Sequence, residues 1–294
     1  MKLQFSGHES FICKHFWLKK GYDFVTHNGN FGDDTAVIEL GVGKNMVNSI
    51  SFWLKAFGLI GPNQEVSEIA NKLFSEKTGF DPYIENLASV WLLHYSLVKT
   101  DKASLYSLFF NEFRKLRTGF TKDQLANFIK RLFEDENQKN YNENTINSDI
   151  SVFLRNYLKP SYKETKIDIE EDFSSLMIDL DLIKSYKAEN TEGKIVDWYQ
   201  MESKIQIDLP AEVVLFSILD NESYGKSIAF KELQVGFNSP GVIFVLNEEG
   251  LYSKLGQITE KFKGITYTET AGVRELQIKT SLNKWDVLHG YYKN

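Results

Sequence analysis

Two pairs of polar residues near the N-terminus have the side chains that a metal-dependent nuclease uses. His8 and Glu9 are adjacent, and Asp33 and Asp34 follow in the same N-terminal stretch. Carboxylates hold magnesium in such sites, and a nearby imidazole can position or deprotonate the attacking water. We therefore expect His8, Glu9 and Asp34 to be catalytic if the protein cleaves a phosphodiester. Glu9, Asp33 and Asp34 would then bind the metal cofactor, Mg²⁺ or Mn²⁺.

The same residues also have a structural interpretation. Adjacent polar residues such as His8 and Glu9 can cap a turn or cross-link a segment without taking part in any reaction. Residue types alone do not choose between the two interpretations, and both stay open at this stage.

The stretch Gly41-Val-Gly-Lys44 has the glycines and the lysine of a phosphate-binding loop, but not their spacing. Such a loop has four residues between its glycines and a Ser or Thr after the lysine. Here one residue separates the glycines and Asn45 follows Lys44, which argues against an NTPase. The backbone amides at this predicted helix start could still bind a DNA phosphate together with Lys44.

Candidate DNA contacts are basic or small polar residues on predicted helices, which can reach phosphates and base edges. They are Lys44, Asn45, Lys55, Lys130, Arg131, Asn144 and Asn147. The chain has a net charge of −6, yet residues 1–160 hold 19 basic and 18 acidic residues, which leaves 15 and 22 for the rest. If one half of the chain contacts phosphate, the first half is the candidate.

Helix pairs are predicted to position these residues. Apolar residues recur at every third or fourth position over 45–57, with Asn45 as a predicted N-cap and Gly58 as a stop. Short strands are predicted around Phe5 and at 22–25, beside this first pair.

A second helix pair is predicted at 120–158. Thr121 can cap its first helix, and the second helix is predicted from about 143 to 158. In the C-terminal half, short helices precede two strands that turn at Ala271-Gly272. The fold expected is mainly α with small β wings, built from winged-helix and helix-turn-helix segments. The predicted domains are 1–62, a winged-helix-like unit; 63–160, helical with a helix-turn-helix; and 161–294, winged-helix-like.

Composition excludes several classes of protein. The single cysteine, Cys13, excludes an internal disulfide and a cysteine-rich zinc site. No apolar run reaches the roughly 18 residues that a membrane helix needs, and the N-terminus lacks a signal-peptide core. We therefore expect a cytoplasmic protein that does not associate with membranes.

Several motifs together resemble a known family. They are Gly7-His-Glu-Ser-Phe11, the stretch 17–24, Leu40-Gly-Val-Gly-Lys-Asn-Met-Val47 and the stretch 52–60. With them the chain resembles the SspB-type family, a bacterial domain-of-unknown-function family of DNA phosphorothioation and phage-defence operons. The resemblance runs nearly end to end. It implies a DNA-nicking component that works beside sulfurtransferase and ATPase proteins, and it assigns no catalytic residue.

Two other functions remain compatible with the sequence. One is a non-catalytic winged-helix adaptor that recruits the sulfurtransferase or ATPase partners to DNA. The other is a sequence-specific transcription regulator. Cleavage of DNA would separate the nicking endonuclease from both.

Overall fold

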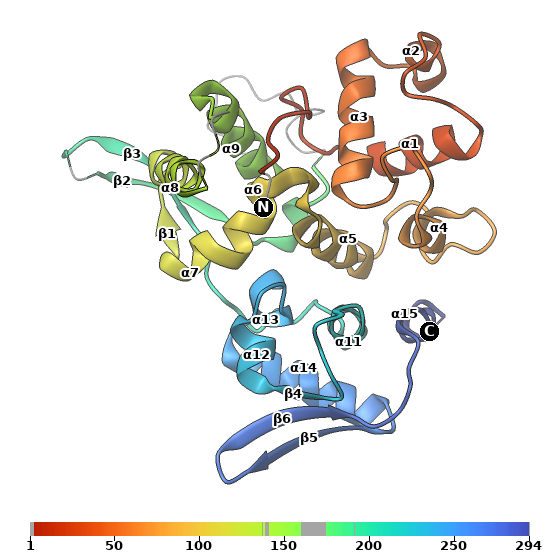
Figure 1. Cartoon of the computed structure of the whole chain (residues 1–294), viewed down its shortest axis with the longest axis vertical. Helices are drawn as coiled ribbons and strands as arrows, with labels where there is room; N and C mark the ends of the chain where they lie inside the picture. The colour runs from red at the N-terminus through yellow and green to blue at the C-terminus, as the bar shows by residue number, and fades with distance from the viewer. Residues whose placement is uncertain (1–2, 137, 139–140, 160–174, 191, 294) are drawn as a thin grey trace. The chain divides into compact units, whose positions relative to one another are not determined.

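The computed structural model describes residues 3–136, 138, 141–159, 175–190 and 192–293 (Figure 1). The described residues are mainly helical with small β elements, as the sequence predicts, and the β elements form two small three-stranded antiparallel sheets. The chain forms two compact units, one of residues 1–84 and 96–202 and the other of residues 85–95 and 203–294. The domain boundary predicted at residue 160 lies outside the described residues. Nowhere in the described chain is a helix long and apolar enough to cross a membrane.

Short and medium helices make up most of the first unit. They are α1 (Trp17–Thr26), α2 (Ala36–Leu40), α3 (Lys44–Ala56), α4 (Glu68–Phe74), the end of α5 (Leu87–Lys99), η1 (Asp101–Ala103), α6 (Ser104–Leu108), the π-helical η2 (Phe109–Phe113), α7 (Arg114–Leu116), α8 (Lys122–Asp135), α9 (Glu143–Tyr157) and η3 (Ile178–Leu180).

Helix α3 confirms the helix predicted at 45–57. Its apolar stripe, including Ile50 and Trp53, is buried. The helix ends just before Gly58, whose φ of 64° is the left-handed conformation that commonly follows a helix. The predicted N-cap is wrong. Gly43 holds that position with an extended backbone, and Asn45 lies in the first helical turn.

The strands predicted around Phe5 and at 22–25 are also wrong. Residues 22–25 lie inside α1, and Phe5 belongs to no strand. The buried residues of α1 include Trp17, Leu18 and Tyr22, whose spacing fits one helical face. Packing of that face outweighs the strand preference of the aromatic residues. Strands therefore flank the second helix pair, α8 and α9, and not the first.

An aromatic core joins the segment from α6 to α7 with helices α8 and α9. The ring centroid of Phe109 lies 4.6 Å from that of Phe153 and 5.2 Å from that of Phe120. The predicted cap of α8 is confirmed, since Thr121 and Gln124 form a reciprocal capping box. The predicted second helix is confirmed as α9.

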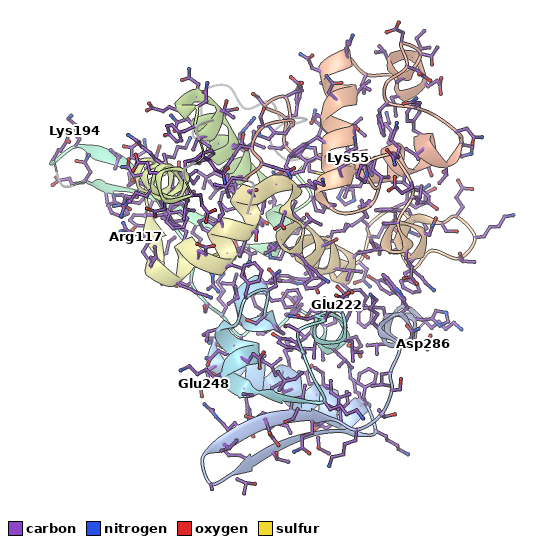
Figure 2. All side chains as sticks on the ribbon, in the orientation of Figure 1. Lys55, Arg117, Lys194, Glu222, Glu248 and Asp286 are labelled. Carbon is purple, nitrogen blue, oxygen red and sulfur yellow. The ribbon has the colours of Figure 1, made fainter. Side chains whose placement is uncertain are left out.

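The sheet of the first unit has the strand order β1-β3-β2 and is antiparallel throughout. Its strands are β1 (Gly119–Phe120), β2 (Lys184–Glu189) and β3 (Ile195–Gln200). Strand β1 comes before α8 in the chain, and the β2–β3 hairpin comes after α9. Lys194 lies at the hairpin turn (Figure 2).

The second unit has its own helices and sheet. Its elements are the start of α5, then α11 (Ala211–Leu219), β4 (Ser227–Ala229), α12 (Phe230–Val235), α13 (Pro240–Ile243), α14 (Glu248–Lys261), β5 (Ile265–Thr270), β6 (Val273–Ile278) and α15 (Lys284–Tyr292). The strand order is β4-β6-β5, again antiparallel. The predicted hairpin turn is confirmed: Ala271 and Gly272 have φ of 50° and 79°, as a two-residue type I′ turn requires.

His94 is a buried polar group in the core of the second unit. It lies on α5 with 0% exposure, and its Nε2 is 2.9 Å from the carbonyl oxygen of Ile243. Because a carbonyl only accepts, Nε2 carries a proton and donates it. Burial, which disfavours the charged imidazolium, lowers the pKa of His94 from 6.5 to about 4, partly offset by this hydrogen bond.

We predict that His94 makes the second unit less stable as the pH falls from 6.5 to about 4. Above this window the imidazole is neutral in both states, whereas inside it the unfolded chain binds a proton that the folded chain does not. The contribution to the free energy of unfolding should fall by about 1.4 kcal/mol per pH unit. Urea unfolding of wild type and His94→Gln at several pH values measures it, because the variant lacks this titration. Equal pH dependence in the two proteins would contradict the prediction.

Candidate functional site

The segment from Ser6 to Ser10 has an unusual backbone. Ser6, Gly7, Glu9 and Ser10 have φ of 73°, 104°, 49° and 64°. Left-handed conformations are uncommon for residues other than glycine, and clusters of them persist only where surrounding contacts hold them. The segment therefore needs a specific anchor.

Asp149 of α9 supplies this anchor. The backbone N–H of Ser6 lies 2.9 and 3.1 Å from its two carboxylate oxygens, and Nε2 of His8 lies 2.9 Å from Oδ1. The N–H of Ser10 donates to Nδ1 of His8 at 3.1 Å. An imidazole that accepts at Nδ1 carries its proton on Nε2 and can donate it to the carboxylate. Both ring nitrogens of the buried His8 are therefore engaged within the segment and α9.

Helix α3 packs against the other side of His8. Its imidazole is stacked near Trp53, with centroids 6.3 Å apart, and meets Phe52 edge-on at 5.7 Å. A Cβ on Gly7 would lie 2.6 Å from the Phe52 ring, so this close approach requires glycine. The segment thus joins α3 to α9, as the ribbon shows (Figure 1).

Further hydrogen bonds fasten the segment to α9. Arg155 donates from Nη2 to the carbonyl of Ser10 at 2.5 Å, and the hydroxyls of Ser10 and Ser148 are 3.3 Å apart. The N–H of Cys13 donates to Oδ1 of Asn156 at 3.0 Å. Residues 6–13 therefore follow α9 for about two turns.

The predicted catalytic residues fall at two places. Glu9 is exposed, and its carboxylate accepts a hydrogen bond of 3.4 Å from Asn48 of α3. Asp33 and Asp34 are exposed between α1 and α2. Among the described residues, no hydrogen bond or ion pair joins His8 or Glu9 to Asp33 or Asp34. The described residues contain no group of three or more His, Cys, Asp or Glu side chains that could hold a metal ion.

The predicted DNA contacts lie on three helices of the first unit. Lys44 and Asn45 are exposed in the first turn of α3, and Lys55 is half-buried near its end (Figure 2). The other four residues are all exposed: Lys130 and Arg131 on α8, Asn144 and Asn147 on α9.

The N-terminal segment, α3 and α9 meet at the His8–Asp149 contact, which we call the junction. A cavity of about 950 Å³ lies next to it. Its lining comes from the N-terminal segment, α3, the segments that follow α3 and α5, α8, and the start of α9. Lining residues include Gln4, Phe5, Ser6, Phe52, Lys55, Glu65, Asp101, Lys102, Phe133, Asn142, Thr145 and Ile146. The cavity brings Lys55 beside the start of α9, a proximity that the sequence does not predict.

Several important residues were missed by sequence reasoning. Asp149 is the central one, and one signal could have indicated it. It lies within the apolar stripe of α9, next to Ile150 and three residues after Ile146. A carboxylate on a buried helix face needs hydrogen-bond donors from elsewhere in the chain. Asn48 and Arg155 carry no such signal, because each is an ordinary polar residue on a helix surface.

Fold and junction together define a class of mainly helical proteins with two small sheets, in which a buried His–Asp pair fixes the N-terminal segment. The chain belongs to the family described as a protein of unknown function, DUF4007, whose model matches residues 5–292.

Two solved structures are similar to the chain over nearly its whole length. A crystal structure of SspB with bound magnesium is similar at a TM-score of 0.83 and 26% identity, over 99% of this chain and 88% of that one. A second SspB crystal structure has a TM-score of 0.83 and 27% identity, with the same coverage. Among curated proteins, none matches the chain.

We predict that His8 and Asp149 stabilise the fold as a coupled pair. Asp149→Ala leaves the Ser6 amide and the His8 imidazole without an acceptor and should lower the free energy of unfolding by about 2–5 kcal/mol. In a double-mutant cycle with His8→Ala, the coupling should be about 0.5–3 kcal/mol. Urea unfolding measures each value, with Glu134→Ala, an exposed acid on α8, as the matched control. Strictly additive costs would contradict a coupled pair.

Proposed function

We propose that both units contain a winged helix. Such a domain combines three helices with a three-stranded sheet. The second helix of its helix-turn-helix reads the DNA. The first unit supports this with the chain order α6 to α7, β1, α8, α9, β2, β3 and the sheet order β1-β3-β2. The second unit has the corresponding order α11, β4, α12, α14, β5, β6 with the sheet β4-β6-β5. The hairpins β2–β3 and β5–β6 would be the wings.

Helix α9 is the recognition helix that we propose for DNA. Asn144 and Asn147 are exposed on its first two turns, and Ser151 follows one turn later, bonded to Lys122 of α8 at 3.3 Å. The adjoining wing carries Lys184, Lys187 and Lys194, all exposed, of which Lys187 pairs with Asp197 at 3.7 Å and Lys194 with Glu192 at 2.9 Å. Asparagines suit base edges and lysines suit phosphates.

The corresponding helix of the second unit is acidic. Glu248 (Figure 2), Glu249 and Glu260 of α14 are exposed. Glu248 pairs with Arg274 of the wing at 2.6 Å. Phosphate would be repelled from such a surface. This observation favours protein docking by the second unit, and with it the adaptor as a second candidate function.

We infer that the chain is a DNA-binding component of a bacterial phosphorothioation-linked defence system and nicks DNA with a bound divalent metal. The observation that carries this function is the similarity to SspB over 99% of the chain, together with the magnesium ion in one of the SspB structures. Sulfurtransferase and ATPase proteins of the same system would be the partners.

The structure offers oxygen ligands for such a metal at Glu9. Its carboxylate is exposed on the anchored left-handed segment and accepts a hydrogen bond from Asn48. Magnesium keeps several waters, so one or two protein carboxylates suffice to hold it. The metal would stabilise negative charge on a scissile phosphate. Since both nitrogens of His8 are engaged, the geometry favours His8 as a positioning residue for Glu9 over a proton acceptor.

We predict Mg²⁺- or Mn²⁺-dependent conversion of supercoiled plasmid to open circles, abolished by EDTA. Glu9→Gln and Asp34→Asn, made separately, should each slow nicking and raise the Mg²⁺ concentration needed for half-maximal activity, because each removes a carboxylate ligand of the metal. Glu76→Gln, an exposed acid outside the segment, is the control. DNA binding and melting temperature should be unchanged in all three variants. Full activity of both test variants would contradict a role for these acids, and binding without nicking by wild type would favour the adaptor.

We predict that the first unit supplies the phosphate contacts. Neutralising Lys130 and Arg131 to Gln should weaken binding to any sequence and lower the salt slope by about one unit per lost contact. Asn144→Ala and Asn147→Ala should instead reduce discrimination between sequences and leave the slope unchanged. Fluorescence anisotropy over a salt series measures both effects, with Lys77→Gln as the control. Unchanged affinity of the double neutral variant at every salt would exclude this patch.

A further inference from the structure

The cavity beside the His8–Asp149 junction has a lining suited to a planar polar group and has room for more than the group itself. Its volume of about 950 Å³ lies near the upper end of the roughly 300–1,000 Å³ that is usual for ligand sites, so a base can enter together with its sugar and phosphate. We propose that it receives a single nucleobase extruded from bound DNA. This proposal rests on the proposed DNA binding and deepens it.

Aromatic rings form part of the wall. Phe5 and Phe133 lie with ring centroids 5.6 Å apart, and Phe52 of α3 lines the same cavity. Phe5 and Phe52 are half-buried, so part of each ring remains accessible. Bases stack on such rings regardless of their identity, because every base has a π-face.

Polar groups of the lining match the edge of a base. The carboxamides of Gln4 and Asn142 and the hydroxyl of Thr145 can donate and accept hydrogen bonds. The Asn142 oxygen already caps α9 by accepting from the Thr145 N–H at 3.0 Å, which leaves its amide group to donate. Mixed donors and acceptors suit the edges of a nucleobase better than they suit a purely apolar ligand.

The charges of the lining favour one phosphate over several. Lys55 and Lys102 line the cavity, and neither forms an ion pair with another described residue. Glu65 and Asp101 line it as well, so the cavity is not a general anion site. A neutral base inside, with its single backbone phosphate at one of the lysines, fits this balance better than a triphosphate.

The cavity adjoins the helix that we propose for DNA reading. Asn142 and Thr145 line it, while Asn144 and Asn147 of the same two turns are exposed. A duplex that contacts those asparagines would therefore place one of its bases near the cavity. Enzymes that act on a nucleotide commonly extrude a base into such a pocket, at a cost of a few kcal/mol for unstacking and unpairing.

Two duplexes test the proposal on the full chain, with EDTA present to prevent cleavage. They carry the same 5-iodouracil, placed opposite adenine in one and opposite an abasic residue in the other. Because the second base is already unpaired, we expect about tenfold tighter binding of that duplex. Irradiation should crosslink its iodouracil to Phe5, Phe52 or Phe133, as identified by mass spectrometry.

Variants localise the effect to the cavity. Thr145→Trp should obstruct the cavity beside Asn142 and weaken the preference for the abasic duplex, whereas Thr78→Trp, on an exposed loop, should keep it. Lys102→Ala, at an exposed position, should weaken binding of the abasic duplex, and Lys77→Ala should not.

The outcomes separate this proposal from the proposed function. Equal affinity for the two duplexes, with no crosslink to the three phenylalanines, would overturn the base pocket and leave DNA binding intact. No binding of either duplex would overturn both. Crosslinking of free 5-iododeoxyuridine monophosphate to the same rings, with equal affinity for the duplexes, would assign the cavity to a free nucleotide and overturn extrusion.

Discussion

The carboxylate of Asp149 lies inside the first unit, where a charge without hydrogen-bond donors would cost several kcal/mol. Its donors come from residues more than 140 positions earlier in the chain, the Ser6 amide and the His8 imidazole. To deliver them, the N-terminal segment adopts successive left-handed conformations and Gly7 lies against the Phe52 ring. The position of Glu9 at the surface and one wall of the adjacent cavity both follow from this interaction.

Part of each unit has the same order of helices and strands, but the exposed residues of the last helix in that order differ. In the first unit, α9 exposes asparagines and its hairpin exposes lysines; in the second, α14 exposes glutamates. The apolar spacing that builds the core is independent of the residues on the exposed face, so under the proposed function one topology would serve DNA in one unit and protein in the other. A net charge of −6 averages over these two surfaces and hides the difference between them.

Much of the local structure could be predicted from the sequence, because the forces that determine it act over a few residues. The apolar repeat of α3, the Thr121–Gln124 cap and the Ala271-Gly272 turn each depend on neighbours in the chain. The predicted strands at Phe5 and at 22–25 were wrong for the same reason. Strand propensity is a local preference, and the buried helical face of α1 outweighs it.

The candidate site could be predicted only in part. Residue types identified His8 and Glu9 as a pair worth attention, and the motif around them indicated the family. Which partner His8 takes, however, depends on a contact between residues 141 positions apart, and no local pattern encodes such a pairing. The sequence by itself determined helices α3 and α9, the Thr121–Gln124 cap and the family, since these follow from spacing and motif. The tertiary structure alone decided that His8 meets Asp149 and that Lys55 shares a cavity with Thr145, because burial and hydrogen bonding act between segments that only folding brings together.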